Sequence, residues 1–246
     1  MPLLDDFALE YTVFEEFSPV CAVVVAAGNS TRMGENKQFI PLLGIPVVAR
    51  SLLAFESCSK VRDIVVVTLE ENIPDIEKIC EEYDITKLVA VVKGGETRQQ
   101  SVENGINAAP IDTAYYAIHD GARPLITPEQ ISETIESATL HGASAIGVYV
   151  KDTIKKVTID KRIVETPKRD FLMAVQTPQI FSADIYKKAL RNCHEQNLEV
   201  TDDCALVEAA GYPVFINEGN YENIKITTRE DIAVAEAILS RRMGNV

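Results

Sequence analysis

The chain has 246 residues, of which 46% are hydrophobic and 25% charged, and its formal net charge is −13. This composition is typical of a globular protein, and the length suits one large α/β domain. The negative charge argues against a nucleic-acid partner, because counterion-release binding needs a basic face. No apolar run reaches the roughly 18 residues of a membrane span, and the first residues are acidic where a signal peptide is basic. We therefore expect a cytoplasmic protein with no membrane partner.

The first 19 residues carry five acidic side chains and no Lys or Arg. We predict an acidic N-terminal extension over 1–19, followed by a single domain over 20–246. Aromatic residues within the extension leave two alternatives open, docking on the domain and disorder. The five cysteines form no CxxC pair, and their scatter is typical of a reducing compartment. The three histidines are isolated in the sequence, which argues against a zinc site.

Short β-branched runs alternate with segments of helical periodicity along the whole domain. We predict strands at 20–26, 63–68, 88–92, 114–119, 144–150, 172–176, 213–216 and 223–227. We predict helices at 47–57, 75–83, 99–109, 128–140 and 183–194, and a last one opening at Thr228 with Asp231 as its capping-box partner. This alternation predicts a doubly wound, mostly parallel, Rossmann-like sheet with helices on both faces. Ligands of such sheets bind beyond the carboxyl ends of the strands.

Residues 150–166 break this rhythm. They contain two short β runs around Asp160-Lys161, which indicates a hairpin and not a strand–helix unit. We predict a β-hairpin arm that projects from the sheet.

The first predicted strand ends in a glycine turn, within the run AAGNSTRMGENKQ that begins at Ala26. Backbone N–H groups in such a turn can bind a phosphate. Neither the dinucleotide fingerprint GxGxxG nor the P-loop pattern is present. Arg32 and Lys37 follow the turn and are able to reach a polyphosphate. The alternative is a plain strand–loop connection with two solvated cations.

Two further loops follow predicted strands. One contains Gly94 and Gly95, with Arg98 and Ser101 entering the next helix; glycines there allow a ligand to approach the backbone. By itself this pattern is weak, since glycines before a helix often form only a turn. The other places Asp120 at the carboxyl end of a strand, where a carboxylate is an expected Mg²⁺ ligand for a nucleotide substrate. For Arg123 in the same loop we favour a structural ion pair.

Lys225 interrupts the apolar run 223–227. Burial of an unpaired ammonium group is costly, so an inward-facing Lys225 needs a carboxylate or an anionic ligand. The alternation of the run also allows Lys225 to face solvent.

Taken in order, the motifs AAGNSTRMGENKQ, GGETRQQSV, HDGARP, DTIKK, QTPQIF, TDDCALVE and EGNYENIKITTREDI resemble the 2-C-methyl-D-erythritol 4-phosphate cytidylyltransferase family. The resemblance runs from about Val20 to Arg241. It implies transfer of CMP from CTP to the polyol phosphate 2-C-methyl-D-erythritol 4-phosphate, with Mg²⁺ as cofactor and release of pyrophosphate. It also implies a homodimer formed through the arm, so that part of each substrate site comes from the partner subunit.

The resemblance assigns site residues position by position. Four cations are implied to be catalytic: Arg32, Lys37, Arg169 and Lys225. The implied CTP site comprises Ala26, Ala27, Gly28, Gly95, Glu96, Arg98, Ser101, Asp120 and Gly121, with Asp120 at the metal. Thr153, Arg169, Thr177 and Lys225 are implied to bind the polyol phosphate.

Two positions depart from the usual family pattern. Ser30 stands where the first loop commonly has a second glycine, and Gly121 replaces an alanine of the third motif.

The sequence also leaves two rival functions open. A ribitol 5-phosphate cytidylyltransferase would share the fold and the CTP loops, and a non-catalytic nucleotide-binding protein would be expected to lack one of the cations or the metal carboxylate.

Overall fold

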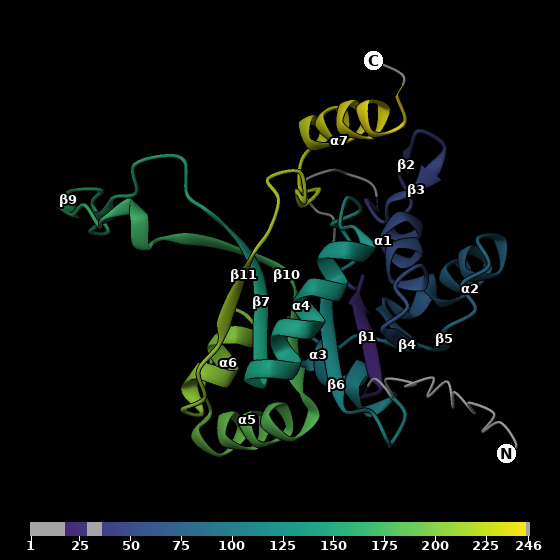
Figure 1. Ribbon diagram of the computed structural model, residues 1–246, viewed down its shortest axis with the longest axis horizontal. Coiled ribbons are helices and arrows are strands. Elements are labelled where there is room, and N and C mark those ends of the chain that lie inside the picture. Colours follow the sequence, from purple (N-terminus) through teal and green to yellow (C-terminus); the bar gives the residue numbers. More distant parts are fainter. Residues whose placement is uncertain (1–17, 29–35, 245–246) are drawn as a thin grey trace, which may run out of the picture.

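Figure 1 shows the computed structural model of the protein, which describes residues 18–28 and 36–244. Its central sheet has seven strands in the order β11-β7-β10-β6-β1-β4-β5. They are β1 (Val20–Val25), β4 (Val61–Thr68), β5 (Leu88–Lys93), β6 (Tyr115–Asp120), β7 (Ala143–Tyr149), β10 (Met173–Ser182) and β11 (Phe215–Glu218). Two small hairpins lie outside this sheet, β2 (Pro41–Leu42) with β3 (Ile45–Pro46), and β8 (Lys156–Val157) with β9 (Ile163–Glu165).

The sheet is parallel except at β10, which runs antiparallel to both β6 and β7. The connections explain this difference. Helical crossovers return the chain to the starting edge of the sheet and so produce parallel neighbours. The chain leaves β7 at its carboxyl end, passes through the arm and re-enters as β10 from that same end, so β10 has to run the other way (Figure 1).

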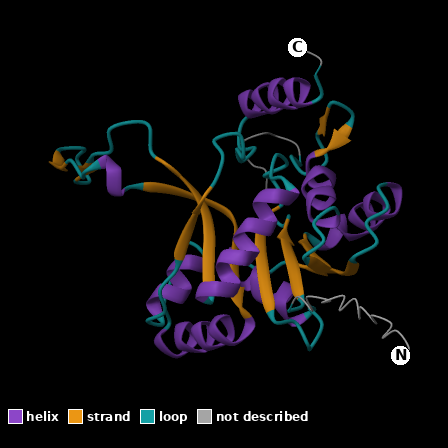
Figure 2. Ribbon diagram, viewed as in Figure 1, coloured by secondary structure: helices purple, strands orange, loops and turns teal. Residues whose placement is uncertain are grey.

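Helices cover both faces of the sheet (Figure 2). The helices α1 (Val47–Glu56), α2 (Ile73–Glu82) and α4 (Pro128–His141) supply side chains to one apolar cluster, and α3 (Arg98–Asn107), α5 (Ala183–Gln196) and α6 (Asp203–Ala209) supply a second. Strand β1 faces both, because Ala22 and Val24 point into the first cluster and Val23 into the second. Among the described residues, no helix has both the length and the apolar character to cross a membrane.

The predicted fold class is confirmed, and six predicted helices and seven predicted strands appear with small shifts at their ends. The strand expected at 172–176 continues to Ser182 as β10, and α6 and two short 3-10 helices, η1 (Glu70–Asn72) and η2 (Arg169–Phe171), were not anticipated. The strand expected at 223–227 was wrong. That segment is an irregular loop whose Ile226 N–H donates to the carbonyl of Ala122, outside any sheet ladder.

The predicted arm is confirmed as a projecting hairpin, β8–β9 (Figure 1). Lys161 adopts a left-handed φ of 64° at its tip, and the Lys161 N–H donates to the carbonyl of Thr158. Together with η2, which follows it, the hairpin forms a segment over residues 150–171 that is termed the arm below; the arm exposes apolar side chains, including Ile159 and Phe171. Of the predicted acidic extension, residues 1–17 lie outside the described part of the chain.

The last helix, α7 (Arg229–Arg242), holds several loops together. Its predicted cap forms, since Asp231 Oδ2 accepts hydrogen bonds from the N–H groups of Thr227 and Thr228. Near its other end, Arg242 donates to Glu222 and to the carbonyl of Leu125. Helix α7 therefore connects the loop that carries Lys225 to the loop that follows β6.

The packing of α3 on the sheet yields a stability prediction. A Cβ atom at Gly105 would lie 2.5 Å from Val23 Cγ1 and 2.7 Å from Val67 Cγ2. Gly105→Ala should therefore lower the free energy of unfolding by about 1–3 kcal/mol, because overpacking against rigid β-branched side chains outweighs the helix propensity of alanine. The control is Asn107→Ala on the exposed side of the same helix, expected within about 0.5 kcal/mol of wild type. Urea unfolding of both variants checks this, and a stabilised Gly105→Ala would contradict the packing argument.

Candidate active site

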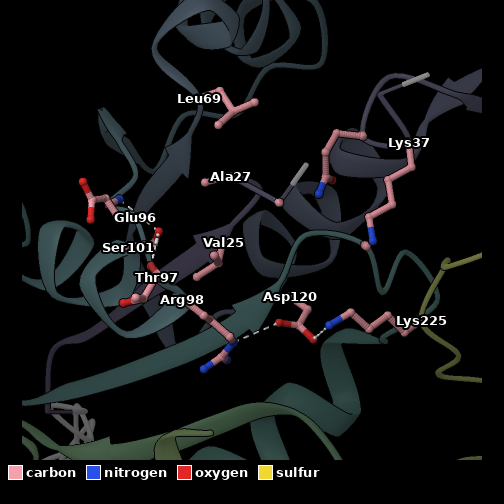
Figure 3. A pocket seen from close by; sticks show the side chains of 14 residues that line it. Val25, Ala27, Lys37, Leu69, Glu96, Thr97, Arg98, Ser101, Asp120 and Lys225 are labelled. Carbon is pink, nitrogen blue, oxygen red and sulfur yellow. Dashed lines mark hydrogen bonds and ion pairs between the residues drawn. The ribbon is translucent and has the colours of Figure 1, made fainter. Parts of the chain in front are cut away.

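A pocket of about 390 Å³ opens at the carboxyl ends of the parallel strands. It lies between the loops that follow β1, β5 and β6 and the loop before α7 (Figure 3). The side chains of Lys37, Arg98, Asp120 and Lys225 bring charge into it. The pocket thus occupies the place where doubly wound sheets bind their ligands.

The Asp120 carboxylate is the most constrained group of the pocket. Its Oδ2 lies 2.7 Å from Lys225 Nζ, and its Oδ1 lies 3.6 Å from Arg98 Nε (Figure 3). Arg123 Nε lies 3.8 Å from Oδ2. Burial favours the neutral acid, but the positive charges of Lys225 and Arg98 outweigh it and lower the pKa of Asp120 to about 2. Asp120 is therefore an ionised carboxylate at neutral pH, surrounded by cations.

Backbone hydrogen bonds hold the cationic side of the pocket in place. Ile226 is fully buried, and its N–H donates to the carbonyl of Ala122, which fixes the neighbouring Lys225 beside the loop after β6. Lys37 Nζ donates to the carbonyl of Ile226 at 3.0 Å. Two lysines from distant parts of the sequence thus converge on one side of Asp120.

The opposite wall is the turn between β5 and α3. The Gly95 N–H donates to Ser101 Oγ, and that hydroxyl donates to the carbonyl of Thr97. Gln100 Oε1 accepts from the N–H of Glu96 and completes a capping box with Thr97. A Cβ at Gly95 would lie 2.3 Å from Gln100 Cβ, so the turn requires glycine there. The wall is therefore rigid before any ligand binds.

Comparisons with known proteins agree with this geometry. The sequence model of the 2-C-methyl-D-erythritol 4-phosphate cytidylyltransferase family matches residues 20–241. The chain is 47% identical over 225 residues to the enzyme of that name from Caldanaerobacter subterraneus, covering 90% of this chain and 99% of the relative. It is 45% identical to the one from Pelotomaculum thermopropionicum, covering 92% and 97%. The chain belongs to this family.

Solved structures agree with that assignment. The 4-diphosphocytidyl-2C-methyl-D-erythritol synthase of Anaerococcus prevotii superposes with a TM-score of 0.82 at 30% identity, over 91% of this chain and 96% of that one. The cytidylyltransferase of Thermus thermophilus gives a TM-score of 0.73 at 29% identity, over 89% and 98%. The protein is thus a cytidylyltransferase, and the resemblance noted from the motifs is confirmed.

Most residues that the family resemblance pointed to lie together in the pocket. Nine of them line it: Ala27, Gly28, Lys37, Gly95, Glu96, Arg98, Ser101, Asp120 and Lys225. Ala26 and Gly121 are buried behind this lining, where the Gly121 N–H donates to the carbonyl of Val25. Arg32 lies outside the described residues.

Of the four residues expected to bind the polyol phosphate, Lys225 lines the pocket. The other three, Thr153, Arg169 and Thr177, are not in the lining. Thr177 is buried under it, where its Oγ1 accepts from the Asp120 N–H at 3.0 Å and lies 3.1 Å from His119 Nδ1. Thr153 and Arg169 are exposed on the arm, and Arg169 donates to the carbonyl of Lys151. Within one chain, the structure therefore separates the arm residues from the loops that line the pocket.

Part of the lining was not predicted from the sequence, notably Gln38, Leu69 and Thr97. Leu69 directly follows β4, so its place at the end of a parallel strand could have indicated it as a pocket residue.

For Arg123, the structural pairing we favoured is confirmed, since Arg123 Nη1 donates to the carbonyl of Asn223 and its Nε lies 3.8 Å from Asp120.

The donor set can be tested against Mg²⁺. Among the described residues, no three His, Cys, Asp or Glu side chains form a metal cluster, and Asp120 is the carboxylate at the base of the pocket. The ionised Asp120 carboxylate in such a pocket suits Mg²⁺, which keeps several waters and takes other ligands from substrate phosphates. The residues fit an ion that arrives with the nucleotide.

The Asp120 charge network yields a prediction about acid stability. Because the folded-state pKa of Asp120 is about 2, below its ordinary value of 3.8, the ionised carboxylate stabilises the fold above about pH 4 and loses that effect as the pH falls toward 2. The span corresponds to about 2 kcal/mol. Urea unfolding at pH 4.5 and pH 2.5 should show that the free energy of unfolding falls less between these two pH values for Asp120→Asn than for wild type.

The control for this measurement is Asp152→Asn on the exposed arm, which should behave like wild type. If Asp120→Asn and wild type lost equal stability between the two pH values, the coupling of Asp120 to its cations would be refuted.

Proposed function

We propose that this enzyme transfers CMP from CTP to the phosphate of 2-C-methyl-D-erythritol 4-phosphate and releases pyrophosphate. The observation that carries the proposal is the buried Asp120 carboxylate with Lys37, Arg98 and Lys225 around it, at the strand ends of a chain belonging to this family. A triphosphate carries several negative charges, which complement the positive charge that these cationic side chains bring to the pocket.

The reaction needs little covalent chemistry from the protein. The acceptor phosphate is ionised at neutral pH and can attack the α-phosphorus of CTP in line, so no general base is required. Burial lowers the pKa of His119, beside Asp120 in sequence, to about 4, and the ring is fully buried as a neutral group. Lys37 and Lys225 stand where they can neutralise charge that builds up during the displacement, the main form of catalysis in phosphoryl-type transfer.

Mg²⁺ completes the proposed site. Asp120 would hold the ion together with the phosphates of CTP, and the ion would supply charge neutralisation at those phosphates. Lys225 and Arg98, which pair with Asp120 in the structure, would then also balance the negative charge of the nucleotide.

We propose that the acceptor site is completed by the arm of a second subunit. The arm carries Thr153 and Arg169 away from the pocket of its own chain, and it exposes apolar side chains such as Ile159 and Phe171. An exposed apolar surface of this kind favours association. All five cysteines are free and buried, which supports a reducing compartment, and we place this dimer in the cytoplasm.

The direct test is pyrophosphate release from CTP and Mg²⁺, with 2-C-methyl-D-erythritol 4-phosphate and ribitol 5-phosphate offered in parallel. Turnover with the first acceptor alone is expected. Turnover with ribitol 5-phosphate alone would keep the CTP site and overturn the acceptor. Absence of turnover with both, with CTP still bound, would leave a nucleotide-binding protein and overturn the function.

Lys37→Ala should lower kcat by about 100- to 1000-fold and change the KM for CTP only a few-fold, because its charge acts mainly on the transition state. The ammonium is already held toward the pocket by the carbonyl of Ile226. Steady-state kinetics with Lys188→Ala, an exposed lysine of α5, as control checks this. Equal changes in kcat and KM would reduce Lys37 to a simple binding group.

Site sharing between subunits predicts complementation. Arg169→Ala and Lys225→Ala should each be nearly inactive, but a heterodimer would have one site with both side chains intact. Random mixing of the two variants, by unfolding and refolding together, should restore about a quarter of wild-type activity. An unrestored mixture whose heterodimers are shown by native mass spectrometry would mean that the arm does not serve the partner.

A further inference from the structure

A buried carboxylate outside the pocket holds one of its cations. Asp203, the first residue of α6, is 2% exposed, and its Oδ2 accepts a hydrogen bond from Arg98 Nη1 at 2.6 Å. Arg98 is the residue whose Nε lies 3.6 Å from Asp120 (Figure 3). The two aspartates therefore bind opposite ends of the same guanidinium group.

Every polar group of Asp203 is fixed by buried neighbours. Its Oδ1 accepts from the Tyr186 hydroxyl at 2.6 Å, and its N–H donates to Gln179 Oε1 at 3.1 Å. Tyr186 and Gln179 are themselves buried, on α5 and β10. The carboxylate thus has no freedom to follow a moving partner, so the Arg98 guanidinium is held to a fixed position.

The cap of α6 does not use this carboxylate. The cap of α6 is formed by the neighbouring Asp202, whose Oδ1 accepts from the Ala205 N–H and whose Oδ2 accepts from Gln179 Nε2. A buried charge is costly unless it is paired, and the partner of the Asp203 carboxylate is the Arg98 guanidinium. The two adjacent aspartates therefore have different contacts: Asp202 caps the helix and Asp203 binds Arg98.

The electrostatics show what the pairing does in the pocket. Burial disfavours the charged guanidinium, but the carboxylates of Asp203 and Asp120 outweigh that effect and raise the pKa of Arg98. Because Asp203 is its close partner, Arg98 stays 3.6 Å from Asp120. The 2.7 Å contact of Asp120 is then made by Lys225. Without Asp203, the guanidinium would be drawn onto the Asp120 carboxylate, which would then be less able to take part in binding a metal–nucleotide complex.

We propose that Asp203 is a positioning residue for nucleotide binding. It acts through Arg98, keeping the guanidinium at the wall of the pocket and the Asp120 carboxylate open to Mg²⁺ and CTP. This inference rests on the proposed function, because it needs CTP as the ligand of the pocket.

The test is calorimetric binding of CTP in the presence of Mg²⁺, without acceptor, to the full chain. Asp203→Asn keeps the shape and the acceptor oxygen for Tyr186 but removes the charge, and it should weaken CTP binding about tenfold, as expected for one charge-assisted hydrogen bond. Asp202→Asn is the matched control; asparagine caps a helix about as well as aspartate, and this variant should leave CTP affinity within about twofold. Equal CTP affinity in wild type and Asp203→Asn would overturn the proposal.

A double-mutant cycle separates positioning from a general structural effect. If Asp203 acts through Arg98, then Asp203→Asn should have little further effect on CTP binding in an Arg98→Ala background. Additive losses would overturn the proposal. Tyr186→Phe, which leaves both charges in place, should weaken binding two- to threefold and serves if Asp203→Asn does not fold; an unchanged affinity there would count against the proposal. A wild-type chain that bound no CTP would instead overturn the proposed function.

Discussion

The site depends on one buried carboxylate that is kept ionised by cations from three directions. Asp120 ends the central strand β6, and Lys225, Arg98 and Arg123 approach it from different segments of the chain. Burial alone would favour the neutral acid, so the cations have to be held in place by the fold. Hydrogen bonds hold the loops after β5 and before α7, so a phosphate ligand would meet a site that is already organised.

Helix α7 and the strand β10 carry much of that organisation. Helix α7 binds the loop of Lys225 through Asp231 at its start and through Arg242 near its end. Strand β10 runs behind the site, where Thr177 binds the Asp120 backbone and Gln179 binds the start of α6. The one antiparallel strand of the sheet thus links the arm to the site, so that a contact made by the arm is continuous with the residues that support Asp120 and Arg98.

The sheet, its helices and the strand-end loops were predictable, because hydrophobic periodicity and glycine turns are local signals. The need of an inward-facing Lys225 for a carboxylate or an anionic ligand was also visible, since it stands between Ile224 and Ile226, but the same alternation allowed Lys225 to face solvent. Its segment was nevertheless wrongly predicted as a strand: Ile226 is buried against α7 and not in the sheet. The pairing of Arg98 with Asp203 joins residues 105 positions apart, and the sequence contains no signal that selects Asp203 over Asp202 as the partner.

The central claim is that CTP replaces part of the charge pairing around Asp120. The most direct measurement is a crystal structure of the full chain grown with CTP and Mg²⁺. We expect the triphosphate in the pocket between Lys37 and the turn at Gly95, with Asp120 at the metal and Arg98 still bound to Asp203. A nucleotide bound elsewhere, or bound here with the contact between Asp120 and Lys225 unchanged and no metal at Asp120, would contradict it.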